Sequence, residues 1–119
     1  MDFDFDTTDP DPALQLVPIS FPIPLAAQIG STGVHSVPVG GPAPAGCTGG
    51  TVADPKADPG HICVYARTFT NASFSTFLSP VVRASGEFDS GTDTSGALVV
   101  LTENGPGALA HGTWAVTAP

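Results

Sequence analysis

The stretch that decides the fold runs from residue 47 to residue 65, CTGGTVADPKADPGHICVY, and contains both cysteines of the 119-residue chain. Turn-forming residues dominate its first part, and its last part is an apolar run typical of a β-strand. A zinc site of the ribbon type needs four ligands, and only His61 lies near either cysteine in the sequence. A redox dithiol would place the cysteines in a C-x-x-C motif. The sequence therefore favours a disulfide between Cys47 and Cys63, with two buried free thiols as the alternative.

This disulfide would close a loop rich in glycine and proline that has little apolar core of its own. The chain-entropy model assigns a loop of this size a stabilisation of about 3 kcal/mol. Structural disulfides persist in oxidising surroundings. We therefore expect the protein to be secreted, exposed at a cell surface or carried on the outside of a virion.

The overall composition indicates an all-β protein. Glycine and proline contribute 14 and 13 residues, while 41% of all residues are hydrophobic. Glycine and proline ordinarily make up roughly 12% of a chain together, so turns are numerous here. Many turns combined with enough apolar residues for a core are typical of short antiparallel strands. A chain of this length suits a single domain.

The strand signals are strongest downstream of the opening stretch. Residues 62–70, 97–102 and 113–117 are rich in β-branched and aromatic residues, and seven or eight short strands fit between the turns of the whole chain. We expect one single-domain antiparallel β-sandwich or jelly roll with one disulfide over residues 13–119. The residues expected in its core are Val64, Leu101, Trp114 and Val116.

Upstream, residues 13–29 are apolar but contain Pro18, Pro22 and Pro24. Proline has no amide hydrogen to donate to a strand ladder, so this region should form edge or bulged strands and no helix.

Residues 1–12 are predicted to be an acidic tail that either stays solvated or adds an edge strand. Asp2, Asp4 and Asp6 alternate with two phenylalanines. This spacing resembles the start of an EF-hand loop, but Thr7 and Ala13 stand where the loop needs glycine and glutamate, so no calcium site is expected. The tail is our candidate for docking onto a neighbouring component of an assembly.

The charge balance excludes several classes of partner. Three lysine and arginine residues oppose eleven carboxylates, which gives a formal net charge of −8. Nucleic acid and anionic lipid surfaces both need cationic side chains, so neither is an expected partner. No apolar run is long enough for membrane insertion. The acidic N-terminus lacks the positive start of a signal peptide, so we expect a removed signal or a phage protein released by lysis.

Three segments resemble a family of C-terminal domains in actinobacterial secreted or surface proteins, some of which carry collagen-like stalks. The segments are ISFPIPLAA (19–27), the cysteine stretch ending in GTVADPKADPGHICVY (47–65), and GTWAVTAP (112–119). The resemblance implies a compact β-domain in a longer or assembled fibre-like structure, and the analogy with stalk-end domains implies a trimer. The chain departs from the family in having no collagen repeat and no stalk, which is compatible with a phage-borne version. The family supplies no catalytic residues.

No motif in the chain predicts catalysis, a cofactor or a metal site. No histidine forms an H-E-x-x-H motif or a pair with a carboxylate four residues away; the three histidines are His35, His61 and His111. The segment GTDTSG (91–96) resembles a protease serine loop, but its residue types are ordinary between strands. Glycoside hydrolysis needs two buried acids, and the two glutamates of the chain, Glu87 and Glu103, adjoin turns and are expected to be solvated.

The expected function is structural and not enzymatic. Only 12% of the residues are charged, against a usual fraction of about 25%, so a large share of the surface should be apolar. Such surface can be buried between identical copies. We expect a self-associating domain, most simply a homotrimer, in an extracellular fibre or virion. The alternative is a carbohydrate- or receptor-binding module, with Tyr65 and Trp114 as candidate ligand contacts.

Overall fold

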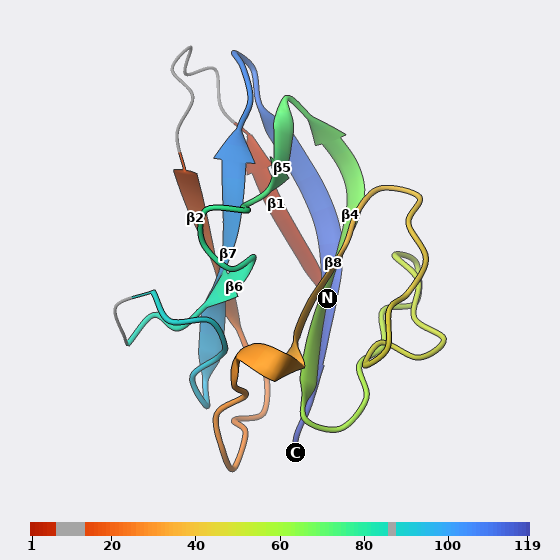
Figure 1. The fold of residues 1–119 in the computed structure, drawn as a ribbon, viewed down its shortest axis with the longest axis vertical. Helices are drawn as coiled ribbons and strands as arrows, with labels where there is room; N and C mark the ends of the chain where they lie inside the picture. Colours follow the sequence, from red (N-terminus) through yellow and green to blue (C-terminus); the bar gives the residue numbers. More distant parts are fainter. Residues whose placement is uncertain (7–13, 86–87) are drawn as a thin grey trace.

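The computed structural model describes residues 1–6, 14–85 and 88–119, and it places two β-sheets face to face (Figure 1). The first sheet has the order β1 (Asp2–Asp6), β8 (Leu109–Thr117), β4 (His61–Thr70) and β3 (Val34–Val37). The second has the order β2 (Leu14–Ser20), β7 (Gly96–Glu103) and β5 (Ala72–Phe74), and β6 (Val81–Val82) also pairs with β7. The helical structure in the described residues is one short 3₁₀ turn, η1 (Ser31–Gly33). The predicted β-sandwich is confirmed.

The core lies between the two sheets and follows the alternation of the strands. Val64 of β4 faces Trp114 of β8 across the first sheet, and both point inward toward Leu101 of β7. Val64 and Leu101 are completely buried, and Trp114 is 4% exposed. Val116 is half-buried and packs against the margin of this core. The four residues expected in the core therefore all contact it.

The N-terminal residues form an edge strand of the first sheet. β1 pairs with β8, the last strand, in an antiparallel register that brings Phe3 opposite Gly112. Phe3 is buried and packs against the rings of Phe69 and Phe74, with centroid distances of 6.4 and 6.3 Å. Residues 2–6 thus add an edge strand to the β-domain, which is one of the two arrangements expected for the acidic tail. Residues 7–12 lie outside the described residues.

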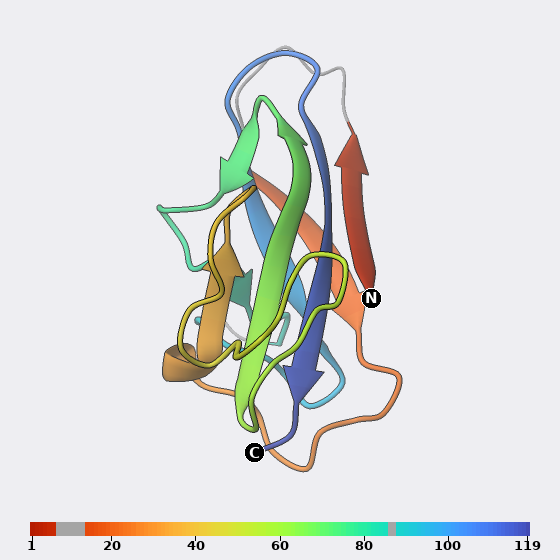
Figure 2. The same cartoon turned by 90° about the vertical axis from the view of Figure 1, so that its right-hand side faces the viewer.

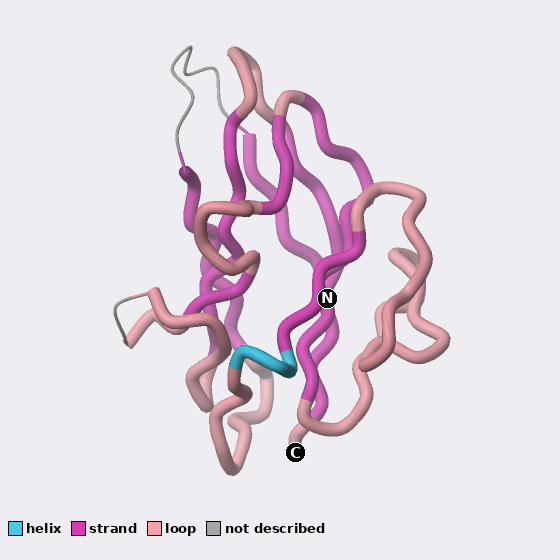
Figure 3. The backbone as a smooth tube through the Cα atoms, in the orientation of Figure 1, coloured by secondary structure: helices cyan, strands magenta, loops and turns pink. Residues whose placement is uncertain are grey.

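One strand pair departs from the expected antiparallel arrangement. β3 runs parallel to β4, with Val34 opposite Ile62 and Val37 opposite Tyr65. Parallel neighbours cannot be joined by a tight turn, so the chain needs a long crossover. Residues 38–60 supply it, and we call them the crossover loop. This loop contains no strand or helix (Figure 3) and passes over the outer face of the first sheet (Figure 2).

Candidate functional site

The crossover loop covers a second, small apolar cluster on the outer face of the first sheet. Its buried members are Val37, Tyr65 and the two cysteines, and Val52 and Ala57 pack against them from the loop. Cys47 and Cys63 form the predicted disulfide, with their Cα atoms 6.1 Å apart, and both are completely buried. The disulfide therefore attaches a loop with few apolar residues to the beginning of β4.

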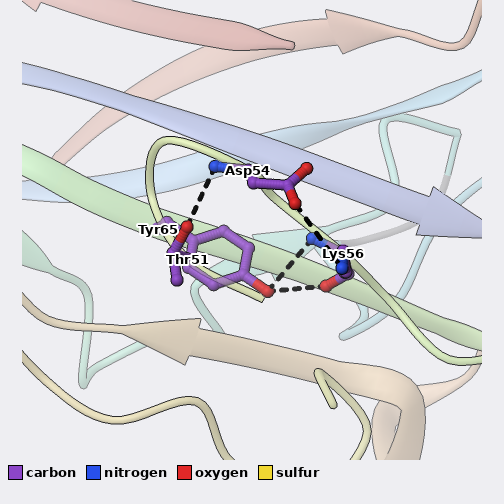
Figure 4. Close-up of polar contacts among 4 residues, drawn as sticks. All are labelled: Thr51, Asp54, Lys56 and Tyr65. Atoms are coloured by element: carbon purple, nitrogen blue, oxygen red, sulfur yellow. Dashed lines mark hydrogen bonds and ion pairs between the residues drawn. The ribbon is translucent and has the colours of Figure 1, made fainter. Parts of the chain in front are cut away.

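Tyr65 anchors the same loop with its hydroxyl group (Figure 4). The hydroxyl donates a hydrogen bond to the backbone oxygen of Lys56 at 2.6 Å and accepts a longer one from the Lys56 amide at 3.4 Å. Next to it, the amide of Asp54 donates to the Thr51 hydroxyl, and the Asp54 carboxylate forms an exposed ion pair with Lys56. The tyrosine side chain therefore fixes the position of the loop and has a structural role.

Threonines on β8 hold the loop in a similar way. The hydroxyl of Thr113 donates to the backbone oxygen of Val52 at 2.8 Å, and the hydroxyl of Thr117 donates to that of Ala57 at 2.7 Å. These threonines occupy the outward positions that the alternation with Trp114 predicts. Hydroxyl groups on the outer face of β8 thus replace the hydrogen bonds that a loop backbone would otherwise make with water.

The predicted ligand contacts, Tyr65 and Trp114, do not form a sugar-binding platform. Tyr65 is 1% exposed and points outward beneath the crossover loop, whereas Trp114 is 4% exposed and points inward against Phe21. Residues on opposite faces of one sheet cannot stack on the same ligand. Trp114 is a core residue, as expected.

The segment GTDTSG (91–96) is a structural turn. Asp93 accepts hydrogen bonds from the amides of Ala84 and Ser85 and from the Ser85 hydroxyl. The Ser85 hydroxyl is the main cause that holds the pKa of the Asp93 carboxyl below its ordinary value. This carboxylate therefore fixes the neighbouring turn, which is the role expected from the residue types.

Glu103 differs from its prediction as a solvated residue. It is 1% exposed, and neither of its carboxylate oxygens has a hydrogen-bond partner among the described residues. Its position explains the burial, because Val99, Leu101 and Glu103 follow one another on the inward side of β7. The other glutamate, Glu87, lies outside the described residues.

Two histidines meet at the foot of the crossover loop. Nε2 of His35 on β3 lies 2.8 Å from Nδ1 of His61 on β4, and the rings stack with centroids 5.0 Å apart. Twenty-six positions separate them in the sequence, so only the parallel pairing of β3 with β4 brings them together. Over residues 1–6, 14–85 and 88–119, no three histidine, cysteine, aspartate or glutamate side chains are grouped so that they could hold a metal ion. The same residues include no helix that could span a membrane.

A mostly apolar surface lies beside the end of β8, and we call it the apolar end surface; the charge next to it is the N-terminal ammonium group of Met1, which donates to the backbone oxygen of Trp114. The surface contains a hollow of about 370 Å³ between residues 21–25 and residues 116–118, and a neighbouring hollow of about 260 Å³ that shares Pro22 and Val116 with the first. Met1, Pro55, Trp114 and Ala115 complete the second hollow. No residue that lines either hollow has an ionisable side chain. Ile23, which lines the first hollow, is 79% exposed.

Prolines determine the local structure of this surface. Pro18 lies within β2, which is an edge strand as predicted, and the chain leaves the sheet before Pro22. The amide of Leu25 then donates to the backbone oxygen of Thr94, which fixes the far end of the segment. Residues 21–25 thus form a bent segment outside the sheet, in which Phe21 packs into the core and Leu25 against it, whereas Pro22, Ile23 and Pro24 are exposed.

Another hollow, which is polar and has a volume of about 210 Å³, lies across β1, β4 and β8. Its polar side chains come from Asp2, Asp4, Arg67, Thr68 and His111. The pairing of β4 with β8 shifts its register between Ala66 and Thr68, which makes Arg67 the extra residue of a β-bulge. Bulges turn a side chain out of the regular alternation, and here Arg67 is exposed.

Comparisons of this chain with models of protein families, with curated proteins and with solved structures give no match. They identify no family, and the resemblance to actinobacterial surface domains stays a prediction.

Proposed function

We propose that this protein is a non-enzymatic, self-associating structural domain of an extracellular fibre or virion, and that the apolar end surface is where copies meet. The observation that carries the proposal is the exposure of Ile23, 79%, within a surface that has no ionisable side chain in its two hollows. Large apolar side chains in a contiguous exposed group mark interaction sites more often than isolated ones do.

The charge of the chain makes the location of this surface important. Each copy has a formal net charge of −8, so two copies repel each other wherever their carboxylates approach. A contact made by prolines, isoleucine, leucine and valine keeps carboxylates out of the interface. The acidic side chains then remain in water, where they limit unspecific aggregation.

The edges of both sheets favour contact through side chains over contact through strand pairing. β1 carries the exposed aspartates Asp2 and Asp4, β2 contains Pro18, and β3 and β5 are only four and three residues long. Charged, proline-containing or very short edge strands disfavour pairing with another chain. The exposed backbone is therefore a poor route to assembly, and the apolar end surface is the better one.

The energetics require most of this surface to take part. Burying one isoleucine side chain contributes about 1.5–3 kcal/mol, while association costs at least about 4 kcal/mol in lost motion. Ile23 alone cannot hold two copies together, but Ile23 with Pro22, Pro24 and Val116 can. A trimer closed around a three-fold axis would bury this surface of every copy where it faces the axis, in keeping with the trimer inferred from the family resemblance. Asp2 and Asp4 then remain available on β1 for another component of the assembly.

The disulfide is compatible with an extracellular or virion-surface location, because such bonds persist in oxidising compartments.

The test compares two substitutions at residues of almost equal exposure. Ile23→Asp places a charge in the apolar end surface, and Phe77→Asp places the same charge at a side chain that is 84% exposed elsewhere. We expect sedimentation velocity and native mass spectrometry at micromolar concentration to show an oligomer for the parent and for Phe77→Asp, and a monomer for Ile23→Asp. A parent chain that stays monomeric on concentration would rule out self-association. Dissociation by Phe77→Asp but not by Ile23→Asp would place the interface elsewhere.

The second candidate is a binding module for a polar ligand such as a carbohydrate, and the hollow around Arg67 favours it. This hollow combines a guanidinium group, an imidazole, a hydroxyl and two carboxylates, which are groups that hydrogen-bond sugar hydroxyls. Calorimetric titration of a monomeric parent with a panel of oligosaccharides, repeated with Arg67→Ala, would test it. Absence of heat with every ligand would argue against the module.

A further inference from the structure

We propose that His35 and His61 form a pH-sensitive clasp that holds the crossover loop closed at neutral pH and releases it on acidification, while the disulfide keeps the loop attached. This inference concerns the outer face of the first sheet, and it stands whether or not the apolar end surface mediates self-association.

A hydrogen bond between the two imidazoles holds the histidine pair together. At 2.8 Å, one of Nε2 of His35 and Nδ1 of His61 must donate a proton and the other must accept it. The bond can form when both imidazoles are neutral and when one of the two is protonated. When both rings are protonated, both nitrogens are donors, and two positive charges face each other in stacked rings. The bond is then lost and replaced by repulsion.

The histidine pair also contacts the crossover loop, at Gly46. Gly46 adopts a φ of 95°, and a Cβ atom at this position would collide with both ring nitrogens of the pair. The backbone oxygen of Gly46 accepts a hydrogen bond from the Asp58 amide at 2.8 Å, which joins the two limbs of the loop. Because Gly46 packs so closely on the rings, they cannot separate without displacing Gly46 and breaking this bond.

The charged groups around the histidine pair come from the elements packed against it. The crossover loop contributes the carboxylate of Asp58, which favours the charged form of His35. β8 faces the pair from the next strand with Thr117 and Ala115, opposite His61 and Cys63, and neither titrates. Cys63 on β4 is held in the disulfide. Of the groups named, Asp58 is the acidic one, and a single carboxylate cannot balance two positive charges.

The electrostatics of His35 agree with this geometry in sign. Burial lowers the pKa of the His35 imidazole, the charge of His61 lowers it further, and Asp58 offsets part of the change. A group whose pKa is lowered in the folded protein contributes stability that is present above its ordinary value, near 6.5 for histidine, and lost as the pH falls through the lowered value. Acid therefore favours the open loop.

The disulfide limits how far the crossover loop can move when it opens. Cys47 follows Gly46 directly, and its bond to Cys63 fixes that point of the loop to β4 in either state. The release is therefore a local displacement around a covalent anchor. It weakens the cover over Tyr65 and Val37 without unfolding the sandwich.

The experiment is amide hydrogen exchange by NMR, corrected for the intrinsic effect of pH, at several values between pH 7.5 and 4.5. We expect the protection of the Asp58 amide to fall at least tenfold over this range while the amides of β7 keep theirs. His35→Gln removes the titration but retains a donor for His61, so its Asp58 amide should stay protected at low pH. His111→Gln is the matched control and should behave like the parent, because His111 lies outside the pair on β8.

Constant protection of the Asp58 amide in the parent would overturn the proposal without the help of any variant. An equal loss of protection in His35→Gln would overturn it as well, because the loss could not then come from the pair. If His35→Gln fails to fold, His61→Gln provides the same comparison.

Discussion

Removing the disulfide should lower stability by a predictable amount without unfolding the sandwich. The two cysteines are 16 positions apart, and for a loop of this size the chain-entropy model gives roughly 3 kcal/mol. The main core contains neither cysteine, because both lie in the small cluster beneath the crossover loop. The loop also keeps its hydrogen bonds to Tyr65, Thr113 and Thr117, so we expect no larger loss.

The assay compares the oxidised chain with a chain refolded in a reducing agent, which leaves every side chain in place. Urea unfolding followed by the fluorescence of Trp114, the single tryptophan, and by far-ultraviolet circular dichroism should show the same cooperative transition in both. With an m-value of about 1–3 kcal/mol/M, the midpoint should fall by about 1–3 M. The m-value should rise on reduction, because the unfolded chain loses its cross-link and exposes more surface.

Two results would refute this reasoning. A decrease below about 1 kcal/mol would mean that the loop is already constrained in the unfolded chain, contrary to the chain-entropy model. Loss of the β-sheet signal without denaturant would mean that the sandwich depends on the crossover loop. A variant with Cys47→Ala and Cys63→Ala is the control, and the reducing agent should leave its transition unchanged.

Two further predictions concern the main core. Trp114→Ala should lower the free energy of unfolding by about 3–5 kcal/mol, because the indole is buried against Phe21; a urea midpoint equal to that of the parent would show that it is exposed instead. Glu103→Met should raise the free energy of unfolding at pH 7 by about 1–3 kcal/mol, because it removes two buried oxygens that lack hydrogen-bond partners among the described residues; Glu103→Gln separates the effect of charge from that of polarity, and a destabilised methionine variant would contradict the prediction.

Local patterns in the sequence were sufficient for the sandwich and its disulfide. Trp114 and Val116 were correctly expected on the core side of the last strand, and Pro18 correctly indicated an edge strand. The alternation of side chains along a strand could have revealed two residues that were misjudged. Glu103 follows Val99 and Leu101 on the inward side of β7, and Tyr65 shares the outward side of β4 with Cys63. In both cases the type of residue was given more weight than its position in the strand.

Other features depend on contacts that no local pattern contains. The parallel pairing of β3 with β4 can be predicted only if the crossover loop is known to cross over the sheet. Its sequence is equally compatible with a loop that joins two antiparallel strands. The contact between His35 and His61 follows from this pairing and was therefore missed. The apolar end surface could be located only in part, because Pro22 and Ile23 are adjacent in the sequence whereas Val116 joins them from the last strand.

The pairing of the first strand with the last has a consequence for how the protein folds. Asp2 of β1 lies opposite Thr113 of β8, so this edge of the first sheet can form only after almost the whole chain has been synthesised. Until then Phe3 has no place between the sheets, and β4 has only β3 as a neighbour within its sheet. Topologies in which distant segments pair fold slowly, because each contact must first close a long stretch of chain. The nascent chain should therefore expose the apolar side chains of β4 for longer than a protein of the same size built from neighbouring hairpins.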